Sequence, residues 1–252
     1  MQRIWLSVLL GIGLRVYAMA QLEKVEAYYD VLEKESKRER QTIEFVQQDA
    51  GLVADYSRLS QIILLRHGEP ALNKKGWRKR KAAMKFIQDY DSAVIYPPEH
   101  VPVSLQKEEL RMIYTSNLNR SISTASYVFN LPDIQKSDPL FREFERKIFS
   151  FPNLKLPLKW WLTGSRMLWL MGLNKKGIES FGQAKERAKI GVKELENESM
   201  RTGKALLVSH GLLNHFLVKY LKKNGWVEVF DGGKGYLSQK MLVRYTYSPN
   251  SK

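Results

Sequence analysis

Two segments of this sequence place a histidine and a glycine directly after a short apolar run. They are ILLRHG, which ends in Arg66, His67 and Gly68, and LLVSHG, which ends in His210 and Gly211. Each apolar run is typical of a strand that is buried on both faces of a sheet. Ionisable side chains at the ends of such strands indicate a chemical role rather than an architectural one.

The ends of the two strands would form an anion-binding pocket if the strands are neighbours in a parallel sheet. Ligands bind beyond the carboxyl ends of the strands in such sheets. A glycine after each histidine lets a ligand approach main-chain N–H groups. The guanidinium of Arg66 suits bidentate contact with phosphate oxygens. Arg120 would lie near a helix N-terminus, where the helix dipole also favours anions. The pattern therefore predicts that His67 and His210 lie together in an anion pocket.

The segments around these motifs alternate between predicted strands and predicted helices. Strands are expected within residues 62–65, 110–116, 204–209 and 235–247, and helices within residues 78–90, 119–131, 177–201 and 212–225. This alternation predicts an α/β fold, a three-layer α/β/α sandwich with a mostly parallel central sheet. The segment GGKG at 232–235 is predicted to turn between strands, and the tryptophan-rich segment 156–173 to be core or a lid.

Three blocks of the sequence, taken together, resemble the histidine phosphatase superfamily, the phosphoglycerate-mutase-like proteins. LLRHGEP resembles the Arg-His-Gly signature, SNLNRSISTA resembles the Ser-x-Leu-x-Arg-x-x-x-Thr-Ala block, and LLVSHG resembles the late strand that ends in His-Gly. The resemblance covers about residues 60 to 225, and three blocks in the right order are far more specific than any one. It implies a phosphoglycerate-mutase-like fold and a phosphatase that uses no metal and no cofactor.

The resemblance also implies roles for particular residues. His67 would be the nucleophile that takes the phosphoryl group as a phosphohistidine, which water then releases. A neutral imidazole is a good nucleophile at pH 7 and needs no metal to activate it. Arg66, Arg120 and His210 would hold the phosphoryl oxygens and offset charge in the transition state, with His210 either protonated or hydrogen-bonding. Asn73 is a weaker fourth candidate for phosphate contact.

A leaving alkoxide needs a proton, and a carboxylic acid is the usual donor. The family places this acid in a hydrophobic-x-Glu context, which matches Phe141-Arg142-Glu143. We therefore expect Glu143 to be the general acid, with Glu145 as the alternative. The Gly and Trp-Glu-Gly segments that commonly follow the acid are replaced here by RKIFSFPNLKLPL. This departure argues against a mutase, which must retain and reorient its intermediate.

The composition of the chain limits the kinds of ligand and partner that the protein is expected to bind. The 252-residue chain carries a formal net charge of +15, which favours anionic partners, and it contains no cysteine, which excludes disulfides and thiolate zinc sites. No His, Asp and Glu cluster has metal-ligand spacing. The basic segment NKKGWRKRK favours a phosphorylated small-molecule substrate over nucleic acid, and a membrane contact of segment 156–173 stays open. His100 and His215 are predicted to be structural.

The first 60 residues are predicted to precede the catalytic domain. Residues 1–20 combine Arg3, an apolar stretch over 4–14 and Ala18-Met19-Ala20, the pattern of a secretory signal peptide. The expectation is therefore export to a periplasmic or secreted location, with an N-terminal helix of a cytoplasmic protein as the alternative. Residues 21–60 are predicted to be a helical extension, either laid across the domain or used as a partner-binding arm, and residues 61–252 the histidine phosphatase domain.

Two other functions stay open at this point. One is a protein that binds a phosphorylated ligand without turnover, and the other is a basic nucleic-acid-binding protein on the same fold. The combined presence of Arg66, His67, Arg120 and His210 favours an enzyme, because a protein that only binds its ligand does not need the nucleophile.

Overall fold

The computed structural model describes residues 43–45, 47, 56–104, 110–150 and 154–245. Its helices and strands, in chain order, are β1 (Leu59–Arg66), β2 (Trp77–Arg78), α2 (Arg80–Ser92), β3 (Ile113–Ser116), α3 (Asn119–Phe129), β4 (Gln135–Asp138), β5 (Leu156–Pro157), α4 (Leu158–Leu170), α5 (Phe181–Thr202), β6 (Lys204–Ser209), α6 (Gly211–Lys223), β7 (Val227–Asp231) and β8 (Gln239–Tyr245). Short 3-10 turns lie at Tyr56–Arg58, Pro132–Ile134 and Pro139–Phe141.

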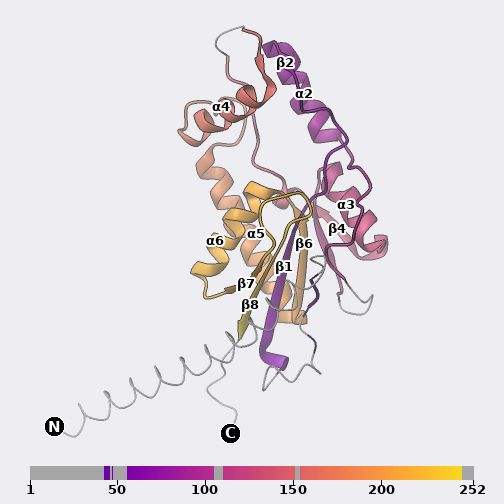
Figure 1. Ribbon diagram of the computed structural model, residues 1–252. Coiled ribbons are helices and arrows are strands. Elements are labelled where there is room, and N and C mark those ends of the chain that lie inside the picture. Colours follow the sequence, from indigo (N-terminus) through magenta and orange to yellow (C-terminus); the bar gives the residue numbers. More distant parts are fainter. Residues whose placement is uncertain (1–42, 46, 48–55, 105–109, 151–153, 246–252) are drawn as a thin grey trace, which may run out of the picture.

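Six strands form the central sheet, in the order β4-β3-β6-β1-β8-β7 (Figure 1). The first four strands in this order are parallel to one another, whereas β8 pairs antiparallel with β1 and β7 pairs antiparallel with β8. In the β1–β6 pair, Arg66 lies opposite Ser209, so the two strands that end in histidine are direct neighbours in matching register. The mostly parallel sheet predicted from the sequence is confirmed.

Helices cover both faces of this sheet. Ile62 and Leu64 of β1 pack with buried residues of α5 and α6, whereas Ile63 and Leu65 pack with those of α3. Successive side chains of a strand point to opposite faces, and both sets are apolar here because both faces are covered. Figure 1 shows α5 and α6 on one side of the strands and α3 on the other. The three-layer α/β/α sandwich is therefore confirmed.

Local signals explain where the long helices begin and end. The side chains of Ser180 and Gln183 form a capping box at the start of α5, and Gly203 ends this helix in the left-handed conformation. The helix predicted over 177–201 thus begins four residues later than expected. The segment GGKG lies between β7 and β8, which form an antiparallel hairpin, so the predicted turn between strands is confirmed.

A smaller unit, here called the cap, lies over the carboxyl ends of the strands (Figure 1). It consists of α2, α4 and the β2–β5 pair, and its core residues are Ala83, Phe86, Ile148, Leu158 and Trp161. The indole nitrogen of Trp161 donates a hydrogen bond of 2.8 Å to the carbonyl of Arg78, which joins α4 to β2. The tryptophan-rich segment therefore contributes to the core of the cap and lies, as part of the cap, over the carboxyl ends of the strands.

Part of the predicted N-terminal extension belongs to the domain core. Ile43 and Phe45 are buried in the hydrophobic cluster on the α3 side of the sheet, and Ile43 forms an isolated bridge with Val103. The predicted signal peptide and residues 21–42 of the predicted helical extension lie outside the described residues, so export stays a prediction. Within the described ranges, no helix combines the length and the apolar character that crossing a bilayer requires.

Candidate active site

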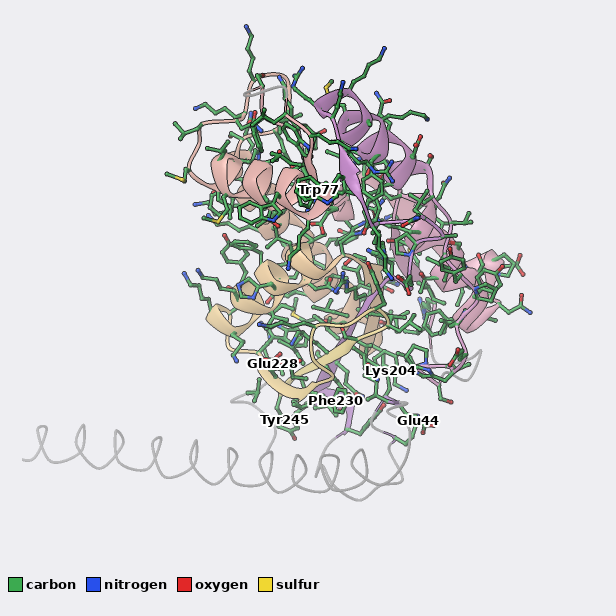
Figure 2. The ribbon with its side chains drawn as sticks, turned by 45° about the horizontal axis from the view of Figure 1, so that its top comes forward. Glu44, Trp77, Lys204, Glu228, Phe230 and Tyr245 are labelled. Atoms are coloured by element: carbon green, nitrogen blue, oxygen red, sulfur yellow. The ribbon has the colours of Figure 1, made fainter. Side chains whose placement is uncertain are left out.

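A cavity of about 310 Å³ lies between the cap and the carboxyl end of β1. Figure 2 shows Trp77 on the cap side of the molecule and Lys204, the first residue of β6, on the other side. The cavity wall includes His67 and six cationic side chains, those of Arg66, Lys74, Arg120, Arg142, Arg146 and Arg166. Three carboxylates, those of Asp91, Glu143 and Glu145, also line it. The surplus of cations makes this an anion-binding cavity.

His67 follows β1 directly, and its side chain is only 2 % exposed. Its Nδ1 lies 2.7 Å from the carbonyl oxygen of Gly68, which can only accept, so Nδ1 carries the proton and Nε2 keeps its lone pair. Burial, followed by the charges of Arg120 and Arg66, lowers the pKa of His67 well below its usual value. The imidazole is therefore neutral at pH 7, with Nε2 able to act as a nucleophile.

Main-chain hydrogen bonds tie the His67 segment to its neighbours. The amide of His67 donates to the carbonyl of Ser209 over 2.9 Å, and the amide of Gly68 donates to the Thr124 hydroxyl over 2.9 Å. The same hydroxyl donates to the carbonyl of Arg120 over 2.5 Å. Thr124 thus links the segment after β1 to α3, the helix that carries Arg120.

Arg66 and Arg120 are positioned by aromatic rings and carbonyls. Arg66 lies over the ring of Tyr236 at 4.6 Å and donates to the carbonyl of Lys234. Arg120 is buried over the ring of Tyr90 at 4.4 Å and donates to the Tyr90 carbonyl over 2.7 Å. The Nε atoms of both arginines are buried and have no hydrogen-bond partner among the described residues. These donors are available to an acceptor that arrives with a ligand.

His210 is fully buried at the N-terminus of α6, and its ring meets the ring of His67 edge-on at 5.1 Å. Its Nε2 lies 2.8 Å from the hydroxyl of Ser116 and 3.4 Å from that of Ser121, whereas Nδ1 has no partner in the described part of the chain. Burial, followed by the charge of His67, lowers the pKa of His210 well below its usual value. Of the two forms expected from the sequence, the structure favours the neutral, hydrogen-bonding one. His210 lies beside His67 but does not itself line the cavity.

Both candidate acids line the cavity. One oxygen of Glu145 accepts a hydrogen bond of 2.6 Å from the amide of Glu179, which anchors it to the loop before α5. One oxygen of Glu143 accepts from the amide of Phe144 over 2.9 Å, and no hydrogen bond to its other oxygen occurs among the described residues. Among the described residues the second oxygen of Glu145 likewise has no hydrogen bond, so one oxygen of each carboxyl group is left for a substrate and both residues stay candidates for the proton donor.

The structure does not bring Asn73 into the cavity. Its side chain is exposed, and its oxygen accepts a hydrogen bond of 2.9 Å from the amide of Lys75, so it closes a local turn in the basic loop. The predicted phosphate contact of this residue has no support in the geometry. His100 is exposed and His215 packs on the ring of Phe216 at 5.4 Å, and neither lines the cavity.

The structure adds Lys74 and Tyr236 to the cavity wall. The Lys74 ammonium donates to the Tyr236 hydroxyl over 2.6 Å and to a Glu69 oxygen over 3.1 Å. Burial alone would lower the pKa of Lys74, but the hydrogen bonds to Tyr236 and Glu69 outweigh it and raise this pKa above its usual value. Lys74 belongs to the basic segment NKKGWRKRK, whereas Tyr236 follows the β7–β8 turn and lies in no motif that the sequence analysis identified.

Within the described ranges, no group of three or more histidine and acidic side chains could hold a metal ion.

Comparisons with known proteins connect this cavity to a family. The family model of the histidine phosphatase superfamily (branch 1) matches residues 98–238, more than half of the chain. This match includes Arg120, Glu143 and His210 and begins after His67. A search of curated proteins finds no match.

Solved structures with similarity to this chain include three enzymes of low sequence identity. A mycobacterial glucosyl-3-phosphoglycerate phosphatase is 20% identical, with 74% of this chain and 91% of that chain covered and a TM-score of 0.43. A phosphoglycerate mutase from Bacillus anthracis is 17% identical, with 76% and 91% covered and a TM-score of 0.44. The ecdysone phosphate phosphatase from Bombix mori is 15% identical, with 77% and 96% covered and a TM-score of 0.43. By its match to the family model, this chain belongs to the histidine phosphatase superfamily.

Proposed function

We propose that this protein is a phosphomonoesterase that works through a phosphohistidine on His67 and needs no metal. Membership of the family supports a phosphatase activity. The observation that carries the proposal is a neutral, buried imidazole in a cavity where Arg66 and Arg120 offer unpaired guanidinium donors. A nucleophile and fixed positive charge at one place are what phosphoryl transfer requires.

The reaction would proceed in two steps. In the first, Nε2 of His67 attacks the phosphorus while the ester oxygen leaves and takes a proton from Glu143. Arg66 and Arg120 hold the phosphoryl oxygens in place. In the second, water attacks the phosphorus, Glu143 takes back a proton, the P–N bond breaks, and inorganic phosphate and neutral His67 are restored.

His210 would support the phosphoryl group as a neutral donor. If its Nε2 accepts from the Ser116 hydroxyl, its unpaired Nδ1 carries the ring proton. The ring contact at 5.1 Å places it beside the attacking imidazole. A neutral donor suits this position, because a second buried cation next to the nucleophile would be costly.

The substrate is proposed to be a phosphorylated small molecule. A cavity of about 310 Å³ lies at the lower end of the range of small-molecule sites, which is roughly 300–1,000 Å³. Apolar side chains of the cap, those of Phe86, Ile87 and Leu162, line the same cavity. Enclosure of this kind supports a small organic phosphate rather than a nucleic acid, which would need an open basic surface.

The first test is hydrolysis of para-nitrophenyl phosphate by the purified protein in excess chelator. His67→Ala is expected to reduce turnover to the background rate, because it removes the group that takes the phosphoryl moiety, whereas His100→Ala, outside the cavity, is expected to retain it. The wild-type protein should carry a phosphoryl label that survives base and is lost in acid. Turnover that persists in His67→Ala would contradict the mechanism, and a wild-type protein that is stabilised by phosphate but never turns over would be a binding protein.

The proton donor is tested with two variants and two kinds of ester. Glu143→Gln is expected to slow alkyl phosphates, whose leaving groups need a proton, by roughly 100-fold or more, and to slow activated aryl phosphates much less. Glu145→Gln is the matched comparison, since its carboxylate is anchored to the Glu179 amide. Selective loss in Glu145→Gln instead would move the acid role to that residue.

A further inference from the structure

The proposed phosphate site, in which Arg66 and Arg120 hold the phosphoryl oxygens, uses only part of the positive charge in the cavity. Arg142 shares the carboxylate of Asp91 with Arg120, at 3.1 Å and 3.4 Å respectively, so its charge is partly offset. Arg146 and Arg166 line the same cavity from the segment before α4 and from α4 itself. These two residues, here called the cap arginines, come from other segments than β1 and α3, which carry Arg66 and Arg120.

Arg166 is held rigidly but without a carboxylate. It donates to the carbonyl of Glu145 over 3.0 Å and to that of Phe144 over 2.7 Å, and it lies over the ring of Trp169 at 4.9 Å. Its Nε is buried without a hydrogen-bond partner in the described part of the chain. Burial and the charge of Arg146 lower the pKa of Arg166 to about 10. The carbonyls thus orient a cation whose charge they do not neutralise.

Arg146 has even fewer partners. No hydrogen bond or ion pair of its guanidinium occurs among the described residues, and its Nε is buried. Burial lowers the pKa of Arg146, and although the charge of Glu143 opposes this effect, no ion pair joins the two side chains. Arg187 shows the contrasting case, because its guanidinium pairs with both oxygens of Glu179, at 3.0 Å and 2.5 Å.

Two half-buried guanidiniums, whose Nε atoms are buried and which lack carboxylate partners and repel each other, are costly in an empty cavity. The cost is offset when an anion binds, since guanidinium donors form their strongest hydrogen bonds with carboxylate or phosphate oxygens. A cap of this kind is therefore suited to receive negative charge. The apolar walls formed by Phe86, Ile87 and Leu162 suit a carbon chain inside the same cavity.

We propose that Arg146 and Arg166 form a second anion subsite, which binds a carboxylate or a second phosphate group at the far end of the substrate. The substrates would then be small carbon-chain phosphates with an anionic group at each end. This inference rests on the proposed function, because it assumes that Arg66, Arg120 and His67 receive the scissile phosphate.

The test compares matched series of phosphate esters with carbon chains of increasing length. One series ends in a hydroxyl group, one in a carboxylate and one in a second phosphate. At the chain length that spans the cavity, the wild-type protein is expected to show a kcat/KM at least about tenfold higher for an anionic end than for the hydroxyl end, as charge-assisted hydrogen bonds allow. The carboxylate and phosphate series distinguish the two kinds of anion.

Substitutions test whether Arg146 and Arg166 cause the expected preference for anionic ends. Arg146→Gln and Arg166→Gln are expected to reduce the ratio of kcat/KM values between anionic and hydroxyl ends, mainly through KM. Lys159→Gln, an exposed position on α4, removes the same charge outside the cavity and is expected to keep the ratio. Equal kcat/KM for all three series at every length in the wild type would overturn the subsite without affecting the phosphatase proposal.

A binding measurement separates the two proposals if no ester is hydrolysed. Non-hydrolysable phosphonates with the same chains and ends can be titrated into the wild-type protein by calorimetry. Tighter binding of the anionic ends supports the subsite even when the proposed activity fails. Equal affinities for the hydroxyl and anionic ends overturn it.

Discussion

Lowering the pH from 7.5 to 5.5 is expected to destabilise the folded protein through its two buried active-site histidines. The pKa values of His67 and His210 are well below 6.5 in the folded state because both rings are buried. In the unfolded chain both groups titrate near 6.5. Below that pH the unfolded chain therefore binds more protons than the folded protein, and its population rises. The contribution of each histidine to stability is fully present above pH 6.5 and is lost as the pH falls toward the folded-state pKa.

The size of this effect follows from the linkage relation. A histidine that stays neutral in the folded protein and has a pKa of 6.5 when unfolded changes the free energy of unfolding by about 1.4 kcal/mol between pH 7.5 and pH 5.5. Two such groups give about 2.7 kcal/mol. Both side chains are at most 2 % exposed, so solvent screening does not reduce this figure appreciably.

Urea unfolding followed by tryptophan fluorescence at the two pH values measures this difference. Carboxylates also titrate in acid, so the informative quantity is the change relative to a variant. His67→Asn is expected to lose about 1.4 kcal/mol less than the wild type between pH 7.5 and pH 5.5, while His100→Asn, at an exposed position, should lose as much as the wild type. An equal loss in His67→Asn and the wild type would refute the reasoning. NMR titration of the four histidines provides a direct check, because a ring of His67 or His210 that titrates near 6.5 in the folded protein would refute it as well.

Two further substitutions test how the site is held in place. Thr124→Val removes the acceptor of the buried Gly68 amide, so it should lower the free energy of unfolding by about 1–3 kcal/mol and reduce kcat, whereas Thr124→Ser should retain both values. Urea unfolding and the phosphatase assay measure these two quantities. A valine variant as stable as the wild type would be evidence against the hydrogen bond. Gly211→Ala would place a methyl group 3.2 Å from Nε of Arg66, so steady-state kinetics should show kcat/KM lower by roughly tenfold or more. Gly182→Ala, whose methyl group would lie 3.8 Å from the Ser180 hydroxyl, should leave kcat/KM unchanged. Equal kinetics for the two variants would show that the position of Arg66 is not sensitive to this contact.

Local sequence patterns correctly predicted the strands and helices that position the site. The apolar runs of β1 and β6 identify strands buried on both faces, and parallel neighbours must bring their carboxyl ends to one edge, which is why His67 and His210 could be expected to meet. Helical sequence patterns located α5 and α6 to within a few residues. The edge strands β4 and β7 were not predicted, because their side chains are at most half-buried and carry no continuous apolar run.

Tertiary structure decided which other side chains complete the cavity. Asn73 lies only six residues after His67 yet turns away to cap its own loop, whereas Arg146 and Arg166 lie far along the chain and reach the same cavity. Spacing within one strand or helix fixes the direction of a side chain over a few residues, and such patterns can be read from the sequence alone. Contacts between the cap and the sheet depend on how two separately packed cores meet, and no local pattern encodes that arrangement.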